Sequence, residues 1–307
     1  MHNAVSCELA ATSARESEAG TTRKYSGQIL AECRQSWEKQ HERSRQIAVK
    51  WSEESEFGDA TASAWFGTHG THISRAIVQR DGAEYMAEVV IGEDDRVRIH
   101  NTERYPYSAI CSLEITASTG RRFVGSGWLA SGSTVITAGH CIFMPDEGGW
   151  AKRVRVYPGR NGPGGGRSFL GARLVSVEGW TSDRRPAADY GAIVLNESAD
   201  DGGSFGYLAL KEKDLRKNIY HVVGYSADKP LGTLWGHIRP LSAVREDILY
   251  YETDTYGGNS GCPVFFVDDE DPQAIYVVGI HNYGDLSGNS ATRITAEVFD
   301  NINEGHS

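Results

Sequence analysis

One serine, one histidine and one aspartate have the surroundings that nucleophilic catalysis requires. Ser260 lies in the glycine-rich segment 254–264, His140 follows the apolar run 135–137, and Asp189 comes directly before the run 190–195. A serine hydroxyl is a weak nucleophile until an imidazole takes its proton, and the imidazole needs a carboxylate that holds its tautomer. The sequence therefore predicts Ser260 as nucleophile, His140 as general base and then acid, and Asp189 as the partner that orients His140.

The loop before the serine supplies the second requirement, which is a place for the developing oxyanion. Gly257 and Gly258 precede Asn259 and Ser260, and glycine adopts the unusual dihedral angles of a tight loop without steric penalty. We expect the backbone N–H groups of Gly258 and Ser260 to form the oxyanion hole, in which one donor is worth about 10²–10³ in rate.

The motifs occur in the order His, Asp, Ser, and from about residue 89 to the end the chain resembles the bacterial glutamyl endopeptidases, a branch of the chymotrypsin-like serine proteases. The resemblance implies two packed six-stranded β-barrels, hydrolysis of peptide bonds through an acyl-enzyme, and cleavage after glutamate. It is carried by seven stretches that follow one another along the chain: 89–96, 105–110, 137–142, 158–162, 189–195, 254–264 and 292–301.

The texture of this region agrees with an all-β fold, because short runs of Val, Ile, Tyr and Phe alternate with glycine-rich loops. A break near residues 202–207 divides residues 89–307 into a first barrel at about 89–200 and a second at about 205–307. His140 and Asp189 would then lie on the first barrel and Ser260 on the second. The spacing of apolar residues within 292–303 predicts a C-terminal helix.

Residues 1–88 are predicted to be a small α+β pro-segment. Residues 1–22 are polar and expected to be disordered, residues 25–55 have helical periodicity, and the turn signal Asp81-Gly82 separates two strand-like runs. By the family resemblance, cleavage between Glu88 and Val89 frees an amine at Val89 that faces the substrate carboxylate.

Two features of the sequence disagree about substrate charge. Asp254 lies six residues before Ser260, where trypsin-like enzymes place the carboxylate that binds arginine or lysine. His281 lies on the strand expected to line the specificity pocket, where glutamate-specific relatives also carry histidine, and Thr255 can add a hydroxyl donor. Because relatives with the same segment select glutamate, we expect glutamate specificity, with cleavage after arginine or lysine as the alternative.

Composition restricts the partners. The chain has 307 residues, a formal net charge of −10 and a pI near 5.5, which argues against binding a polyanion such as nucleic acid. No apolar run reaches the roughly 18 residues of a membrane span. We expect a monomer that acts on proteins or peptides without a cofactor or metal, since the pair His69 and His72 lacks a third ligand at metal spacing.

The cysteines and the N-terminus leave the compartment open. In secreted relatives the cysteine after the base forms a disulfide, but the expected partner position of Cys141, near Gly125, is glycine. Cys111 is the alternative partner, and we expect free buried thiols instead. Residues 1–20 lack the apolar core of a secretory signal peptide, so the protein works inside a cell, leaves by another route, or has lost its leader in this sequence.

A different class of function stays open beside the enzyme. The barrels would then be a catalytically silent binding module, with the N-terminal segment as its partner-binding arm. Labelling by a serine-directed phosphonate discriminates between the two hypotheses, because only an activated serine reacts.

Overall fold

The computed structural model describes residues 51–52, 78–80, 83–85, 90–91, 94–164, 166–199, 203–268, 271, 274–285 and 288–304. Several predicted features lie outside these residues: the segment 1–22, most of the helix predicted over 25–55, the pair His69 and His72, and the cleavage site Glu88-Val89. Within 25–55 the described residues are Trp51–Ser52, and they form the short strand β1 instead of a helix. The two strands β2 (Val78–Arg80) and β3 (Ala83–Tyr85) pair antiparallel on either side of residues 81–82.

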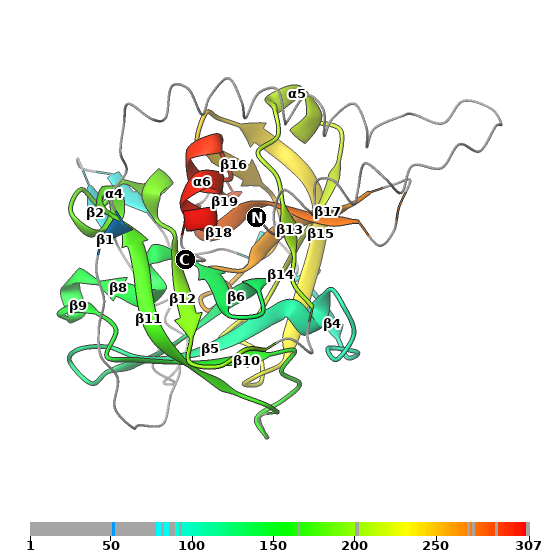
Figure 1. Cartoon of the computed structure of the whole chain (residues 1–307). Helices are drawn as coiled ribbons and strands as arrows, with labels where there is room; N and C mark the ends of the chain where they lie inside the picture. Colours follow the sequence, from blue (N-terminus) through cyan, green and yellow to red (C-terminus); the bar gives the residue numbers. More distant parts are fainter. Residues whose placement is uncertain are drawn as a thin grey trace.

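The first barrel is a sheet of six antiparallel strands that closes on itself through pairing of β11 with β12, and it is drawn in green shades in Figure 1. Small β1 is added at the edge through β11. In sheet order the six strands are β11 (Phe169–Val177), β10 (Arg153–Pro158), β5 (Ile110–Thr116), β6 (Arg122–Ser131), β7 (Thr134–Thr137) and β12 (Gly191–Leu195).

The second barrel has the same design and closes through pairing of β18 with β19. In sheet order its strands are β18 (Ile275–Asp285), β17 (Pro263–Val267), β14 (Ile219–Gly224), β15 (Leu234–Val244), β16 (Ile248–Tyr251) and β19 (Gly288–Arg293). Two short strands join its edges: β13 (Gly206–Tyr207) runs parallel to β18, and β4 (Val97–Ile99) pairs with β15. The prediction of two six-stranded barrels is confirmed.

The helices of the described chain are few and short. Three single-turn helices lie in loops: α3 (Gly139–Ile142), α4 (Glu178–Thr181) and α5 (Glu212–Leu215). Three 3₁₀ turns lie in loops as well, at 107–109, 145–147 and 186–188. The short strands β8 (Phe143–Met144) and β9 (Gly149–Trp150) pair with each other. The predicted C-terminal helix is present as α6 (Ala296–Glu304), drawn in red in Figure 1. Its Val298 and Ile302 are buried.

The barrels are joined by an apolar core and by α6. One cluster of buried residues contains the interior of the first barrel together with Tyr225 and Phe265 of the second barrel and Ile302 of α6. Asn301 of α6 donates a hydrogen bond of 2.6 Å to the hydroxyl of Tyr190, just before β12. A second cluster fills the interior of the second barrel.

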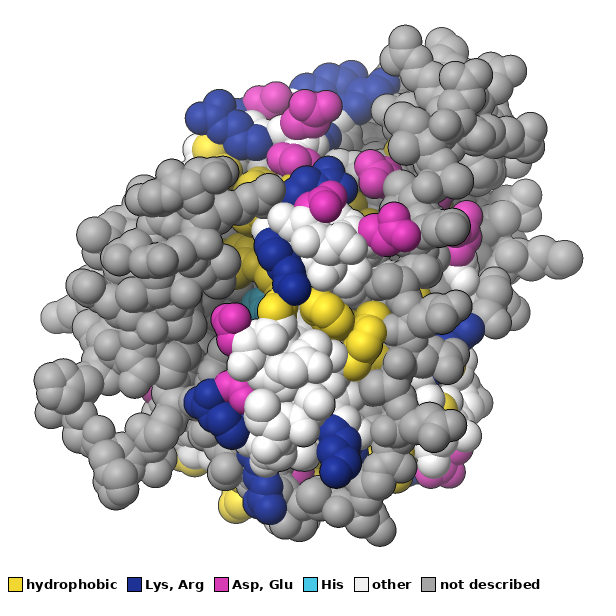
Figure 2. Space-filling view, turned by 90° about the vertical axis from the view of Figure 1, so that its left-hand side faces the viewer, with side chains coloured by type: hydrophobic (Ala, Val, Ile, Leu, Met, Phe, Trp, Pro, Cys, Tyr) yellow, Lys and Arg dark blue, Asp and Glu magenta, His cyan; other side chains and the backbone are white. Residues whose placement is uncertain are grey.

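The surface carries both signs of charge close together. Figure 2 shows basic and acidic side chains interspersed on one face, around a small hydrophobic patch. No helix of the described residues has both the length and the apolar character needed to cross a membrane.

Candidate active site

The first barrel brings His140 and Asp189 together at the ends of neighbouring strands. β7 ends at Thr137, three residues before His140, and Asp189 stands two residues before β12, which pairs with β7. Asp189 Oδ2 lies 2.7 Å from His140 Nδ1, and Asp189 Oδ1 accepts the backbone N–H of His140 at 2.7 Å. One carboxylate thus fixes both the backbone and the ring of the predicted base.

The pair is shielded from water on most sides. Asp189 is fully buried, and the ring of His140 lies near those of Trp180 and Tyr283, with centroids 6.3 and 5.8 Å away. Burial by itself lowers the pKa of His140, but the buried Asp189 carboxylate outweighs that effect and raises the pKa well above 6.5. The arrangement suits an imidazole that accepts a proton and is stabilised when charged.

Ser260 comes from the second barrel and lies beside this pair. Its carbonyl oxygen accepts hydrogen bonds from the N–H of Ser126 at 2.9 Å and from the thiol of Cys141, the residue after His140, at 3.6 Å. The serine itself is buried, with 6% of its surface exposed. The structure therefore collects His140, Asp189 and Ser260 where the two barrels meet.

The loop around Ser260 is fixed by backbone hydrogen bonds, within the loop and to β18. The N–H groups of Asn259, Gly261 and Cys262 donate to the carbonyls of Tyr256, His281 and Asn259. Gly258 has a φ of +101°, and a Cβ there would lie 2.6 Å from the carbonyl oxygen of Tyr225. Only glycine fits this position.

Ser126 on β6 is a residue that the sequence analysis missed. Its hydroxyl donates to the carbonyl of Gly258 at 2.8 Å and accepts the N–H of Tyr225 at 2.8 Å, so a side chain of the first barrel holds the serine loop of the second. The signal available in the sequence is the run Gly125-Ser126-Gly127, since glycines inside a strand mark close approach of another backbone.

His281 is completely buried on β18, and its backbone bonds to the residues after Ser260. Its Nδ1 lies 2.5 Å from the hydroxyl of Tyr251. Burial and the nearby His140 lower the pKa of His281 to about 3, against a smaller opposite effect of the Ser290 carbonyl, so the ring is neutral at physiological pH. Within the described chain, the buried hydroxyl of Thr255 has no hydrogen-bond partner.

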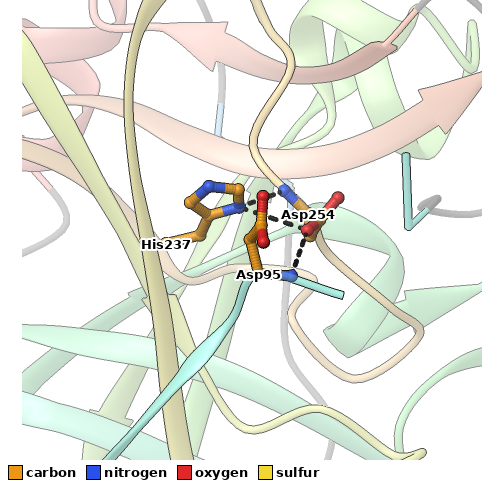
Figure 3. Close-up of side chains that lie close together, drawn as sticks. All are labelled: Asp95, His237 and Asp254. Carbon is orange, nitrogen blue, oxygen red and sulfur yellow. Dashed lines mark hydrogen bonds and ion pairs between the residues drawn. The ribbon is translucent and has the colours of Figure 1, made fainter. Parts of the chain in front are cut away.

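Asp254 is buried and engaged with the chain ahead of β4 (Figure 3). Its Oδ1 accepts the N–H of Ile91 at 2.7 Å and its Oδ2 accepts the N–H of Asp95 at 2.9 Å. The backbone N–H of Asp254 donates to His237 Nδ1 at 2.9 Å. The carboxylate thus anchors residues 91–95 to the second barrel.

The same three side chains, Asp95, His237 and Asp254, are the one group of the described residues whose spacing suits a metal ion. The single in-plane lone pair of His237 Nδ1 already accepts the N–H of Asp254, however, and both oxygens of Asp254 accept N–H groups. Asp95 pairs with Arg239 at 3.2 Å. The donor set fits a backbone anchor better than a metal centre.

The cysteines of the described region agree with the expectation of free thiols. Cys111, Cys141 and Cys262 are free and buried. Gly125 lies opposite Cys141, since a Cβ built on this glycine would be 3.0 Å from the Sγ of Cys141. The glycine stands where a disulfide partner would fit.

Comparison with known proteins identifies the family. The family described as Trypsin matches residues 98–303. The chain belongs to the trypsin family of serine proteases. A glutamyl endopeptidase of Bacillus licheniformis is 40% identical over 231 residues, which cover 72% of this chain and 70% of the relative. A Bacillus subtilis protein named extracellular metalloprotease is 38% identical over 218 residues, covering 69% and 68%.

More distant members agree. A glutamyl endopeptidase of Staphylococcus aureus strain MW2 is 26% identical over 204 residues, covering 64% of this chain and 57% of the relative. A solved Glu endopeptidase in complex with MPD shares the fold, with a TM-score of 0.62 and 24% identity, covering 71% of this chain and all of that one. Together with the family match, these relatives make the protein a serine endopeptidase, similar to the glutamyl endopeptidases, that acts on protein substrates.

Proposed function

We propose that the protein hydrolyses peptide bonds through a triad of Ser260, His140 and Asp189. The observation that carries this proposal is the pair of hydrogen bonds from His140 to the buried Asp189, next to the serine loop. His140 takes the proton of the Ser260 hydroxyl as the serine attacks the carbonyl carbon, and Asp189 stabilises the imidazolium. The N–H groups of Gly258 and Ser260 bind the oxyanion, His140 protonates the leaving amine, and water then releases the acyl group.

The test is Ser260→Ala with Ser131→Ala as control, because Ser131 stands on the first barrel outside the site and its hydroxyl only accepts the N–H of Ser133. Peptide hydrolysis should fall by about 10⁶-fold in the first variant, as for a triad serine elsewhere, and stay unchanged in the second. A fluorophosphonate should label wild type and the control only. Unlabelled wild-type protein would favour the silent binding module.

Substrate selection after glutamate is the second part of the proposal. The neutral, buried ring of His281 and the hydroxyl of Thr255 can both donate hydrogen bonds to the carboxylate of a glutamate side chain. Both oxygens of Asp254 already accept backbone N–H groups, so they are poorly placed to bind the guanidinium group of arginine or the ammonium group of lysine. Mass-spectrometric mapping of cleavage sites in a denatured protein mixture tests it. Cleavage after arginine and lysine that Asp254→Asn removes would establish the trypsin-like alternative.

The third part is activation by cleavage between Glu88 and Val89, which frees the Val89 amine to face the substrate carboxylate. Two observations support a route different from that of trypsin-like zymogens, in which the new amine forms an ion pair with an aspartate directly before the nucleophile, where this chain has Asn259. The side chain of Asn259 accepts a hydrogen bond from Ser226 at 3.0 Å, so the loop is held without an ion pair to a new amine. Asp254 anchors residues 91–95, just after the cleavage site.

Processing is followed by N-terminal sequencing alongside a peptide assay. Wild type should accumulate a fragment that starts at Val89, and Ser260→Ala protein purified alone should stay full length. Glu88→Gln should delay the cleavage, whereas Glu84→Gln should not. Full activity of the uncut chain would instead make residues 1–88 a regulatory or interaction domain.

A metal-dependent mechanism is the competing hypothesis that the name of the Bacillus subtilis relative raises. The cluster of Asp95, His237 and Asp254 argues against a metal-dependent mechanism. The nitrogen that would bind the metal, His237 Nδ1, already accepts the backbone N–H of Asp254. A chelator should therefore leave activity unchanged, and a serine-directed phosphonate should abolish it. The opposite pattern would overturn the triad.

A further inference from the structure

Tyr251 lies behind His281, on the side away from Nε2. It is the last residue of β16, and β19 separates it from β18 in the sheet. The two side chains nevertheless meet, since the Tyr251 hydroxyl is 2.5 Å from His281 Nδ1 and both residues are 0% exposed. Such a buried polar contact constrains the histidine ring strongly, because breaking it leaves polar groups without water.

The contact has consequences for the proton of the ring. A neutral imidazole has one N–H and one lone pair, and a phenol hydroxyl can either donate or accept. Because burial holds the pKa of His281 near 3, the ring does not carry a proton on both nitrogens at neutral pH. If Nδ1 held the only proton, Nε2 would present a lone pair, which repels a carboxylate. Recognition of glutamate by this ring therefore requires that Tyr251 donate to Nδ1.

We propose that Tyr251 is a positioning residue for substrate selection: its hydroxyl donates to Nδ1 of His281, fixes the Nε2–H tautomer and so presents a donor to the glutamate side chain. Tyr251 itself does not touch the substrate. The inference rests on the proposed glutamate specificity and adds to it the residue that makes the neutral histidine a donor rather than an acceptor.

Tyr220 provides a matched control in the same barrel. It is also 0% exposed, and its hydroxyl donates to the carbonyl of Leu215 at 2.8 Å. Replacing either tyrosine by phenylalanine removes one buried hydroxyl and keeps the ring. Both variants should lose some stability, so only an effect on substrate choice separates positioning from a purely structural role.

The first measurement is kcat and KM of processed enzyme on two peptides that differ only in glutamate or glutamine at the cleaved position. Tyr251→Phe should lower the ratio of kcat/KM for glutamate over glutamine about tenfold, through a raised KM, which is the size of one hydrogen bond to a charged group. Tyr220→Phe should leave the ratio unchanged. An unchanged ratio in Tyr251→Phe overturns the inference.

The second measurement needs no folded variant of Tyr251. Nitrogen-15 spectra of the wild-type histidine side chains, with the His281 signals assigned by their loss in His281→Gln, report which nitrogen carries the proton. We expect Nε2–H, and a proton on Nδ1 overturns the inference. A wild-type enzyme without preference for glutamate overturns the specificity proposal and this inference together, whereas a glutamate-specific enzyme with Nδ1–H overturns the role of Tyr251 alone.

Discussion

The two barrels have the same strand plan but hold their parts of the site in different ways. The first barrel supplies His140 and Asp189, which are hydrogen-bonded to each other by ring and by backbone. The second barrel supplies the loop around Ser260, and that loop depends on Ser126 of the first barrel as well as on its own backbone. The proposed base is thus positioned inside one barrel, whereas the loop of the proposed nucleophile is held by contacts between the two barrels.

Asp189→Asn tests the part of the site that the first barrel holds by itself, and we expect it to have the largest effect after the loss of Ser260. The change should lower kcat by about 10⁴, because an amide next to Nδ1 favours the wrong tautomer of the base. The neutral form of His140 is the active one, so wild-type kcat/KM should fall as the pH drops through a His140 pKa that lies above 6.5. The measurement is a pH profile of peptide hydrolysis.

The control for this prediction is Asp183→Asn, since Asp183 is an exposed partner of Arg185. Its profile should match that of wild type. The assignment of Asp189 would be contradicted by an Asp189→Asn enzyme that keeps the kcat of wild type and loses activity at the same low pH as wild type.

His281→Ala tests the second barrel separately from the first. Removing the proposed donor to the substrate carboxylate should lower kcat/KM for a glutamyl peptide about a hundredfold, which lies within the about 1.5–3 kcal/mol of a hydrogen bond to a charged group. The exposed His100 serves as the control in His100→Ala. Phosphonate labelling of Ser260 should persist in both proteins, and loss of labelling in His281→Ala would mean that the change damages the triad.

Ser126→Ala tests the docking between the barrels. The variant leaves the carbonyl of Gly258 and the N–H of Tyr225 without their partner, which costs about 1–3 kcal/mol. We expect kcat to fall about tenfold on glutamyl and glutaminyl peptides alike, since the serine loop serves both. Ser112→Ala, at a buried serine of β5, is the control, and a selective effect on glutamyl peptides would show that Ser126 acts on the pocket instead.

Gly125→Cys should have the smallest effect on catalysis and a measurable one on stability. The new thiol would face Cys141, and closing residues 125–141 into a loop with a disulfide contributes about 3 kcal/mol. Thermal unfolding with and without a reductant measures the gain, and Gly125→Ser is the control without a thiol. An unfolding temperature that does not respond to the reductant would contradict the predicted bond.

The sequence predicted what local patterns encode and missed what only the assembled barrels create. The family resemblance implied both barrels, the short apolar runs agreed with an all-β fold, and the spacing of Val298 and Ile302 predicted α6. The bonds from Ser126 and Tyr251 join strands far apart in sequence, so no local periodicity reveals them. The pairing of β4 with β15 of the second barrel was missed for the same reason.

Asp254 shows that a residue type at one position does not reveal how its side chain is engaged. Protease sequences are often sorted by the residue six positions before the serine, and by that rule this chain belongs with enzymes that cut after basic residues. The rule assumes a carboxylate whose oxygens are open to a ligand, but here the N–H groups of Ile91 and Asp95 occupy them. The backbone segment that lies within reach of such a carboxylate therefore decides how far its oxygens are open to a ligand.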